Sequence, residues 1–231
     1  MIIMYLKYKL SEFSGRINRM GIRPLDVMLV GSTGAGKSST INALFSTSVA
    51  AVGKGVDPET MDLDWYDVHD YLRVWDTPGL GDGIARDKVH AKKIIDLLYK
   101  TYPKEGVSFG FVDLALVIVD GASRDLGTAY KLINEILIPN FQSDRIIVAI
   151  NQADVAKKGA RWNYETNVPD SDVREFLSDK AYSVKTRVVE ATGVEINMPI
   201  CYSASSGYNV SALLDLLVES VPDQRRSIVA S

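Results

Sequence analysis

The sequence predicts an α/β fold, with a six-stranded mixed sheet, one strand reversed and helices on both faces. Short apolar runs alternate with helical patterns from Leu25 to Val221, as in β-α units that stack into a mostly parallel sheet. Only His69 and Asp70 separate two of the runs, which favours an antiparallel hairpin and makes the sheet mixed. The strand candidates are Leu25–Val30, Met61–Val68, Tyr71–Trp75, Asp113–Val119, Arg145–Ile150 and Met198–Tyr202.

Size and composition indicate one ordinary globular domain. The chain has 231 residues, of which 46% are hydrophobic and 24% charged, and its formal net charge is −3. That charge argues against a basic surface for DNA or RNA, so neither a nucleic acid nor the ribosome is an expected partner. The longest apolar run, Leu114–Val119, is too short to span a membrane. Cys201 is the only cysteine, and Lys7 and Lys9 interrupt the apolar start, so we expect a cytoplasmic protein without a signal peptide.

The N-terminal segment has the pattern of an amphipathic helix. Its apolar residues recur at steps of three and four, which places them on one helical stripe: Ile3, Leu6, Leu10, Phe13, Ile17 and Met20. The helix either folds back on its own domain, which we favour, or binds a partner or a membrane surface. We expect this helix over residues 1–23, the main domain over 24–223 and a tail over 224–231.

A phosphate-binding loop follows the first strand. Gly31–Ser38 reads G-x-x-x-x-G-K-S between an apolar run and a helical pattern. Its glycines allow backbone N–H groups to surround a phosphate chain, and the helix N-terminus adds its dipole. Lys37 would bridge the β- and γ-phosphates, and the Ser38 hydroxyl would bind Mg²⁺. The expected nucleotide-binding residues here are Thr33, Gly34, Ala35, Gly36, Lys37, Ser38 and Ser39.

Two further segments are candidates for sensing the terminal phosphate. Asp76-Thr77-Pro78-Gly79 follows a strand, so Asp76 can hold Mg²⁺ through water and the Gly79 N–H can meet the γ-phosphate. A second metal-binding hydroxyl is expected in the glycine-punctuated loop between Phe45 and Met61, where Thr60 is the candidate and Thr47 its rival. We therefore expect Lys37, Thr60 and Gly79 to act in catalysis, and Ser38, Thr60 and Asp76 to hold the metal.

A base pocket is expected from two other strand ends. Asn151-Gln152-Ala153-Asp154 and Ser203-Ala204-Ser205 each follow an apolar strand directly. The Asp154 carboxylate can accept two hydrogen bonds from the N1–H and N2–H₂ edge that guanine has and adenine lacks. The Ala204 N–H can donate to O6, Asn151 can tie the segment to the phosphate loop, and Ser203 completes the pocket.

Taken in order, these four motifs resemble the Ras-like GTPase set. The sequences Asp76-Thr77-Pro78-Gly79-Leu80-Gly81-Asp82 and Ser203-Ala204-(x)₂-Gly207-(x)₂-Val210 look like the bacterial Era-like branch, in the class that also holds septins. The chain is most similar to small GTP-binding proteins encoded by prophages and mobile elements. This resemblance implies a three-layer P-loop NTPase fold, GTP/GDP and Mg²⁺ as ligands, and slow hydrolysis.

Four positions depart from, or add to, that pattern. Gln152 replaces the Lys whose stem packs along the base, which predicts looser nucleotide binding. Leu80 replaces the Gln that orients the attacking water, so turnover should be slow. Gly34 replaces the Asn that potassium-activated relatives use, which makes potassium stimulation less expected. Arg86 could supply charge in cis, although a solvated role is favoured.

Three hypotheses for function follow. The leading one is a slow GTP hydrolase whose nucleotide state orders residues 47–60 and 79–88 and so signals to an effector. The alternative is a binding module in which GTP drives homodimerisation with little hydrolysis, and a third is an ATPase, which Asp154 and Ala204 disfavour. The connection Ala156–Glu195, with Arg161-Trp162-Asn163 exposed, is a candidate partner surface, with half-buried packing of Trp162 as the competing interpretation.

Overall fold

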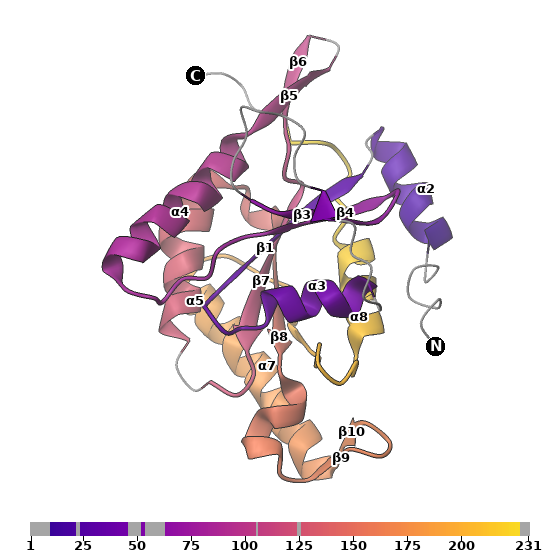
Figure 1. Cartoon of the computed structure of the whole chain (residues 1–231), viewed down its shortest axis with the longest axis vertical. Helices are drawn as coiled ribbons and strands as arrows, with labels where there is room; N and C mark the ends of the chain where they lie inside the picture. Colours follow the sequence, from indigo (N-terminus) through magenta and orange to yellow (C-terminus); the bar gives the residue numbers. More distant parts are fainter. Residues whose placement is uncertain are drawn as a thin grey trace.

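A computed structural model gives the structure of the protein. It describes residues 10–21, 24–45, 52–53, 63–104, 106–123 and 126–226. The described residues form a central sheet in the strand order β11-β8-β7-β1-β4-β3-β2, with two small hairpins beside it (Figure 1). The strands of the central sheet are β1 (Leu25–Gly31), β2 (Val52–Gly53), β3 (Trp65–His69), β4 (Leu72–Asp76), β7 (Leu114–Asp120), β8 (Ile146–Asn151) and β11 (Ile200–Cys201).

The sheet has the six expected strands and the expected reversed one. β1, β4, β7, β8 and β11 pair in parallel, whereas β3 is antiparallel to both β4 and β2. The reversed strand arises because Asp70 and Tyr71 turn the chain between β3 and β4, where the Tyr71 N–H donates to His69 Nδ1 at 3.1 Å. The two-residue β2 is an addition that the sequence did not predict.

Helices cover both faces of the sheet, which gives three layers. The helical segments are α2 (Leu10–Met20), α3 (Lys37–Phe45), α4 (Ile84–Tyr99), α5 (Gly127–Lys131), η1 (Leu132–Leu137), α6 (Ile138–Asn140), η2 (Ser143–Arg145), η3 (Ala153–Gly159), α7 (Ser171–Thr192) and α8 (Val210–Glu219). Figure 1 shows α4 and α5 on one side of the sheet and α2 and α8 on the other.

Successive side chains of the central strands point to opposite faces of the sheet and so contribute to a hydrophobic core on each face. In β1, Met28 and Val30 pack with side chains from α4, η1 and α7, whereas Val27 and Leu29 pack with side chains from α2, α3 and α8. Every residue of β1 is buried, as expected for a parallel strand with helices on both faces.

The N-terminal helix is folded back on this domain over its described part. Phe13 and Ile17 are fully buried in the layer that contains α8, and the Phe13 ring meets His69 edge-on at 5.4 Å. Ile3 and Leu6 lie outside the described residues. The stripe therefore serves packing within the chain at Phe13 and Ile17.

Several expected boundaries were wrong. The first strand of the hairpin begins at Trp65, with Leu63 and Asp64 outside it, and β11 is shorter than expected. Two hairpins were missed: β5 (Thr101–Lys104) with β6 (Val107–Gly110), and β9 (Trp162–Asn163) with β10 (Val168–Pro169).

The expected long connection after Ala156 contains the longest described helix, α7, with 22 residues. Its N-cap is Asp170, whose carboxylate accepts from the Val173 N–H at 2.9 Å. Trp162 is only 6% exposed and meets the Tyr208 ring edge-on at 4.9 Å. The expectation of an exposed Trp162 was therefore wrong, although Arg161 and Asn163 beside it are exposed.

Residues after the last helix also pack against the domain. The Arg145 guanidinium donates to the Gln224 carbonyl at 2.6 Å, and the Arg226 carbonyl accepts from the Gly110 N–H at 2.8 Å. The Arg226 side chain is buried and donates to the Leu98 carbonyl at the end of α4. Within the described part of the chain, no helix combines the length and apolar character that a membrane span needs.

Candidate functional site

The phosphate-binding loop joins β1 to α3 at the carboxyl edge of the sheet. Gly34 and Gly36 have φ values of +81° and +88°, which glycine adopts without strain. A Cβ on Gly36 would lie 2.2 Å from Asn151 Nδ2, and one on Gly31 would lie 2.5 Å from the Ile118 carbonyl oxygen. Glycine is therefore needed at Gly36 both for the turn and for the approach of the base segment.

Lys37 is largely buried within this loop. Its Nζ donates to the carbonyls of Gly31 and Ser32 at 3.4 and 3.2 Å. Burial lowers the pKa of Lys37, whereas the carboxylates of Asp76 and Asp82 raise it. The ammonium group thus lies in the loop where an anion would be held.

Ser38 and Asp76 form the candidate metal site. Ser38 Oγ donates to Asp76 Oδ2 at 3.2 Å, while Asp76 Oδ1 is buried and has no hydrogen-bond partner among the described residues. Burial raises the pKa of Asp76, so a cation at this point would stabilise its charged form. A hydroxyl beside a carboxylate fits the oxygen ligands that Mg²⁺ prefers.

The segment after Asp76 lies directly on the phosphate loop. Thr33 N donates to the Leu80 carbonyl at 2.8 Å, and Leu80 N donates to the Gly31 carbonyl at 3.2 Å. A Cβ on Gly79 would lie 2.5 Å from Thr33 Oγ1, so only glycine fits there. The Leu80 side chain is 5% exposed and packs in the core on the α4 side, so it does not offer a group to solvent.

Polar side chains that the motifs did not include hold this segment in place. His90 Nδ1 lies 2.6 Å from the Gly79 carbonyl, and Asp87 accepts from the N–H groups of Gly81 and Asp82 at 2.9 and 3.2 Å. The Thr33 hydroxyl donates to Asp82 at 2.8 Å. His90 lies one helical turn beyond Asp87 on α4, a spacing that could have indicated a shared face toward the loop.

The base segment is tied to the phosphate loop by two side chains. Asn151 Nδ2 donates to the Ala35 carbonyl at 3.0 Å, which is the contact expected of Asn151. Gln152 Nε2 donates to the Gly34 carbonyl at 2.8 Å, so this residue makes a loop contact of its own. The Ala204 N–H donates to Asn151 Oδ1 at 3.0 Å, and its expected hydrogen bond to guanine O6 stays a prediction.

Asp154 lies at the far end of this arrangement. Its Oδ2 accepts from the Ser205 hydroxyl at 3.1 Å, and that hydroxyl lies 3.1 Å from Ser203 Oγ. Its Oδ1 is buried and has no hydrogen-bond partner in the described part of the chain. A carboxylate with one positioned oxygen and one available oxygen fits an N–H-bearing ligand such as guanine.

Thr60 and Thr47 lie outside the described residues, so their expected roles stay predictions. Arg86 is exposed near the start of α4, in line with the favoured solvated role.

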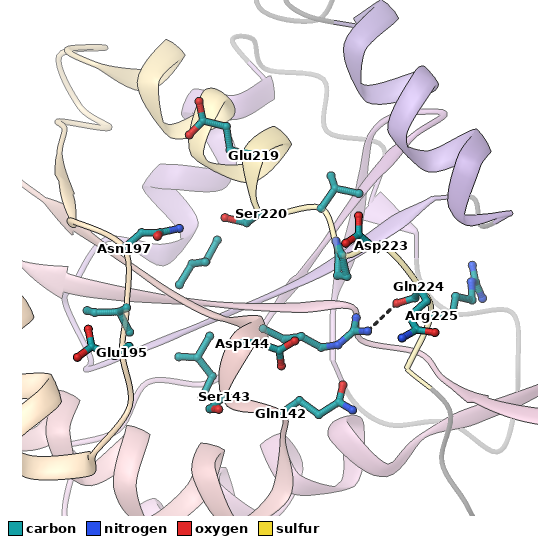
Figure 2. A pocket seen from close by; sticks show the side chains of 16 residues that line it. Gln142, Ser143, Asp144, Glu195, Asn197, Glu219, Ser220, Asp223, Gln224 and Arg225 are labelled. Carbon is teal, nitrogen blue, oxygen red and sulfur yellow. Dashed lines mark hydrogen bonds between the residues drawn. The ribbon is translucent and has the colours of Figure 1, made fainter.

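A second, polar cavity of about 500 Å³ lies at the opposite edge of the sheet. Figure 2 shows Asp144, Glu195, Glu219 and Asp223 among its lining side chains. None of the motif residues lines it. We therefore place the candidate site at the phosphate loop and the base segment.

Fold and site together define the class of a P-loop nucleotide-binding domain with a guanine-type base motif. The chain belongs to a family described as the 50S ribosome-binding GTPases, whose sequence profile matches residues 26–152. The probable GTP-binding protein EngB of Streptococcus thermophilus is 30% identical over 145 residues, which cover 62% of this chain and 67% of that protein. Septin-8-A of Xenopus laevis is 27% identical over 158 residues, 62% of this chain. The match covers only 37% of that septin's length.

Solved structures support the fold. Toc33 from Arabidopsis thaliana, crystallised with GDP and Mg²⁺, matches with a TM-score of 0.63 at 16% identity, covering 98% of this chain and 96% of that one. The bacterial dynamin LeoA from ETEC matches with a TM-score of 0.54 at 16% identity, covering 94% and 39%. At these identities the likeness concerns the three-layer architecture alone.

Proposed function

We propose that this protein binds GTP with Mg²⁺, hydrolyses it slowly and acts as a nucleotide-dependent switch. One observation carries the proposal. Two buried carboxylate oxygens without partners among the described residues, Asp76 Oδ1 and Asp154 Oδ1, mark the metal end and the base end of one site. The phosphate loop lies between them, with Ala35 tied to Asn151.

Each residue has a defined part in this proposal. Lys37 and the loop N–H groups bind the phosphates, and Ser38 and Asp76 hold Mg²⁺. The ion, when bound, neutralises charge that develops on the phosphate oxygens. Gly79 offers its N–H to the γ-phosphate, and Asp154 reads the base. Thr60 adds a hydroxyl to the metal, and its replacement by Ala should weaken GTP binding more than GDP binding.

Slow turnover follows from the position of Leu80. A residue whose side chain is packed in the core cannot orient an attacking water, and the neighbouring Gly79 and Gly81 have no side chains. A group that orients the attacking water must therefore come from another part of the chain or from a partner. The switch segments would be residues 47–60 and 79–88, and the protein would act in the cytoplasm.

The alternative is a module that dimerises with GTP and hydrolyses little of it. One solved Toc33 structure, with a TM-score of 0.65 and 15% identity, is of a dimerisation-deficient mutant, which shows that this architecture occurs in a dimerising protein. Sizing the protein with GDP and with a slowly hydrolysed GTP analogue, beside a turnover assay, separates the two functions.

We also propose the Era-like branch, near prophage-encoded GTP-binding proteins, as the place of this chain within its family. The sequence Gly79-Leu80-Gly81-Asp82 after Asp76 and the Ser203-Ala204 motif support this assignment.

The central experiment compares the affinities for GTP and ATP and measures phosphate release. We expect clear preference for GTP and turnover that Lys37→Ala abolishes. Lys92→Ala is the matched control, because Lys92 forms an exposed ion pair with Asp96 on α4. Equal affinity for ATP, or turnover that survives Lys37→Ala, would refute the proposal.

A further inference from the structure

A pair of hydroxyl groups lies in an otherwise apolar layer of the core. Tyr202 and Thr40 are both 0% exposed, and Tyr202 Oη lies 2.7 Å from Thr40 Oγ1. Tyr202 packs among aliphatic side chains such as Ile41 and Leu213. Phe and Val would fill the same volumes without polar atoms, so packing alone does not require this pair.

The hydrogen bonds of the pair have a definite direction. Thr40 Oγ1 also lies 2.8 Å from the Gly36 carbonyl, which can only accept. Thr40 therefore donates its one hydroxyl proton to Gly36 and accepts from the Tyr202 hydroxyl. Burial raises the pKa of Tyr202 above its usual range, so the phenol keeps its proton and remains a donor.

One end of this chain of hydrogen bonds is the last glycine of the phosphate loop. The Gly36 carbonyl accepts from both the Thr40 hydroxyl and the Thr40 N–H, each at 2.8 Å. Gly36 has a positive φ and touches Asn151, so its peptide has little freedom to move.

The other end lies between the two base motifs. The Tyr202 carbonyl accepts from the Ala153 N–H at 3.0 Å, next to Asp154, and the Tyr202 N–H donates to the Ile150 carbonyl at 2.8 Å. The residue after Tyr202 is Ser203, where the second base motif begins. Tyr202 thus joins both base segments through its backbone and the phosphate loop through its side chain.

We propose that Tyr202 is a positioning residue that couples guanine recognition to the phosphate loop through Thr40 and Gly36. This inference rests on the proposed function, because it concerns the same nucleotide site. Asn151 already links the base segment to the phosphate loop directly, through the Ala35 carbonyl. The hydrogen bonds of Tyr202 and Thr40 add a second, buried connection between the same two parts of the site. Binding of the base then holds the loop in its phosphate-binding form. Equally, binding of the phosphates holds the base segments in the form that binds guanine.

The test is a double-mutant cycle on GDP affinity with Tyr202→Phe and Asp154→Asn. In the otherwise unaltered protein, we expect Tyr202→Phe to weaken GDP binding roughly three- to ten-fold, about the effect of one neutral hydrogen bond. In the Asp154→Asn background, we expect less than a two-fold effect, because the base contact that Tyr202 supports is already impaired. A purely structural role would lower the melting temperature and give the same fold-change in both backgrounds.

Thr40→Val provides a second route if Tyr202→Phe folds poorly. It keeps the β-branched shape, removes both hydroxyl contacts and should weaken GDP binding to a similar extent. Tyr99→Phe is the matched control, since it removes a phenol bond to Asn140 at 3.2 Å far from the site and should leave GDP affinity unchanged. Unaltered GDP affinity in Tyr202→Phe, or additive effects in the cycle, overturns this inference. Failure of the unmutated protein to bind GDP would refute the proposed function instead.

Discussion

Asp154 has one carboxylate oxygen bound to Ser205 and one that is buried without a partner among the described residues. Replacing it with Asn puts an amide N–H₂ where a ligand N–H should be accepted. We expect Asp154→Asn to lower GDP affinity at least roughly ten-fold and to improve binding of xanthosine diphosphate, which has a carbonyl at that edge. Calorimetric titration of both nucleotides checks this, with Asp96→Asn on the surface of α4 as the control. An unchanged preference for guanine would show that another group reads the base.

Leu80 occupies the position at which related GTPases were expected to carry a water-orienting Gln. Its position suggests that Gln could restore a water-orienting group, but the side chain is 5% exposed and lies in the core. Burying a Gln amide there without partners should cost about 2–4 kcal/mol of unfolding free energy. We expect Leu80→Gln to lower the melting temperature and to leave GTP turnover at saturation no faster. A several-fold gain in turnover at unchanged stability would contradict this account.

At the scale of single elements, the N-terminal helix α2 offers a direct test. Phe13 is fully buried against the α8 layer, so truncation leaves a cavity in the core. We expect Phe13→Ala to reduce the free energy of unfolding by about 3–5 kcal/mol, measured by denaturant titration. Arg19→Ala, on the exposed side of the same helix, should change it by less than about 0.5 kcal/mol. A fully stable protein after removal of residues 1–21 would contradict the folded-back packing.

The elements that the sequence predicted are those with a strong local pattern. The apolar runs of β1, β7 and β8 and the turn at Asp70 are visible without tertiary information. The hairpin β5–β6 was missed because Pro103 and the exposed Val107 do not form a half-buried alternation. Helix α7 was not predicted because its apolar stripe is weak. It packs against η1 and η3, and such tertiary contacts are not visible in the sequence.

The residues of the candidate site also fall into those that the sequence could predict and those that it could not. The motif residues could be named because phosphate and base chemistry require those residue types at that spacing. His90, Asp87 and Tyr202 could not, since their roles depend on which backbone group each side chain meets across the fold. The hydrogen bond from the Ala204 N–H to Asn151 Oδ1 could not be predicted either, because the position of that side chain depends on tertiary structure.

For the molecule as a whole, buried charges at the edge opposite the site join the sheet to the last residues described. Asp113 Oδ2 accepts from the Asp26 N–H at 3.0 Å, and Asp26 Oδ1 accepts from Trp75 Nε1 at 2.7 Å. Arg145 donates to the Asp113 carbonyl at 3.3 Å and to Gln224, while Arg226 lies nearby. This edge therefore links β1, β7 and β8 to residues 224–226, and its charge state should influence the stability of the whole domain.

Burial raises the pKa of Asp113 to about 7 and that of Asp26 to about 6, although Arg145, Arg226 and Arg73 oppose the shifts. An Asp in the unfolded chain titrates near 4, so around neutral pH the folded protein binds more protons than the unfolded one. Stability from this pair is therefore present at low pH and is lost as pH rises through 7. Below about pH 6.5, His69 acts in the opposite direction, because burial lowers its pKa to about 4 and the unfolded chain then binds the extra proton.

Between pH 6.5 and 8.0 the largest contribution comes from Asp113, while the last protons leave His69 of the unfolded chain and partly oppose it. We expect the free energy of unfolding to fall by about 0.5 kcal/mol across this interval, since one titrating group is worth about 1.4 kcal/mol per pH unit when fully protonated. Asp113→Asn keeps the shape and the acceptor for the Asp26 N–H but cannot titrate, so its stability should stay nearly level over the same interval. Asp179→Asn, exposed on α7, should retain the original slope. Urea titrations at the two pH values measure all three proteins, and an unchanged slope in Asp113→Asn would move the titration to another group.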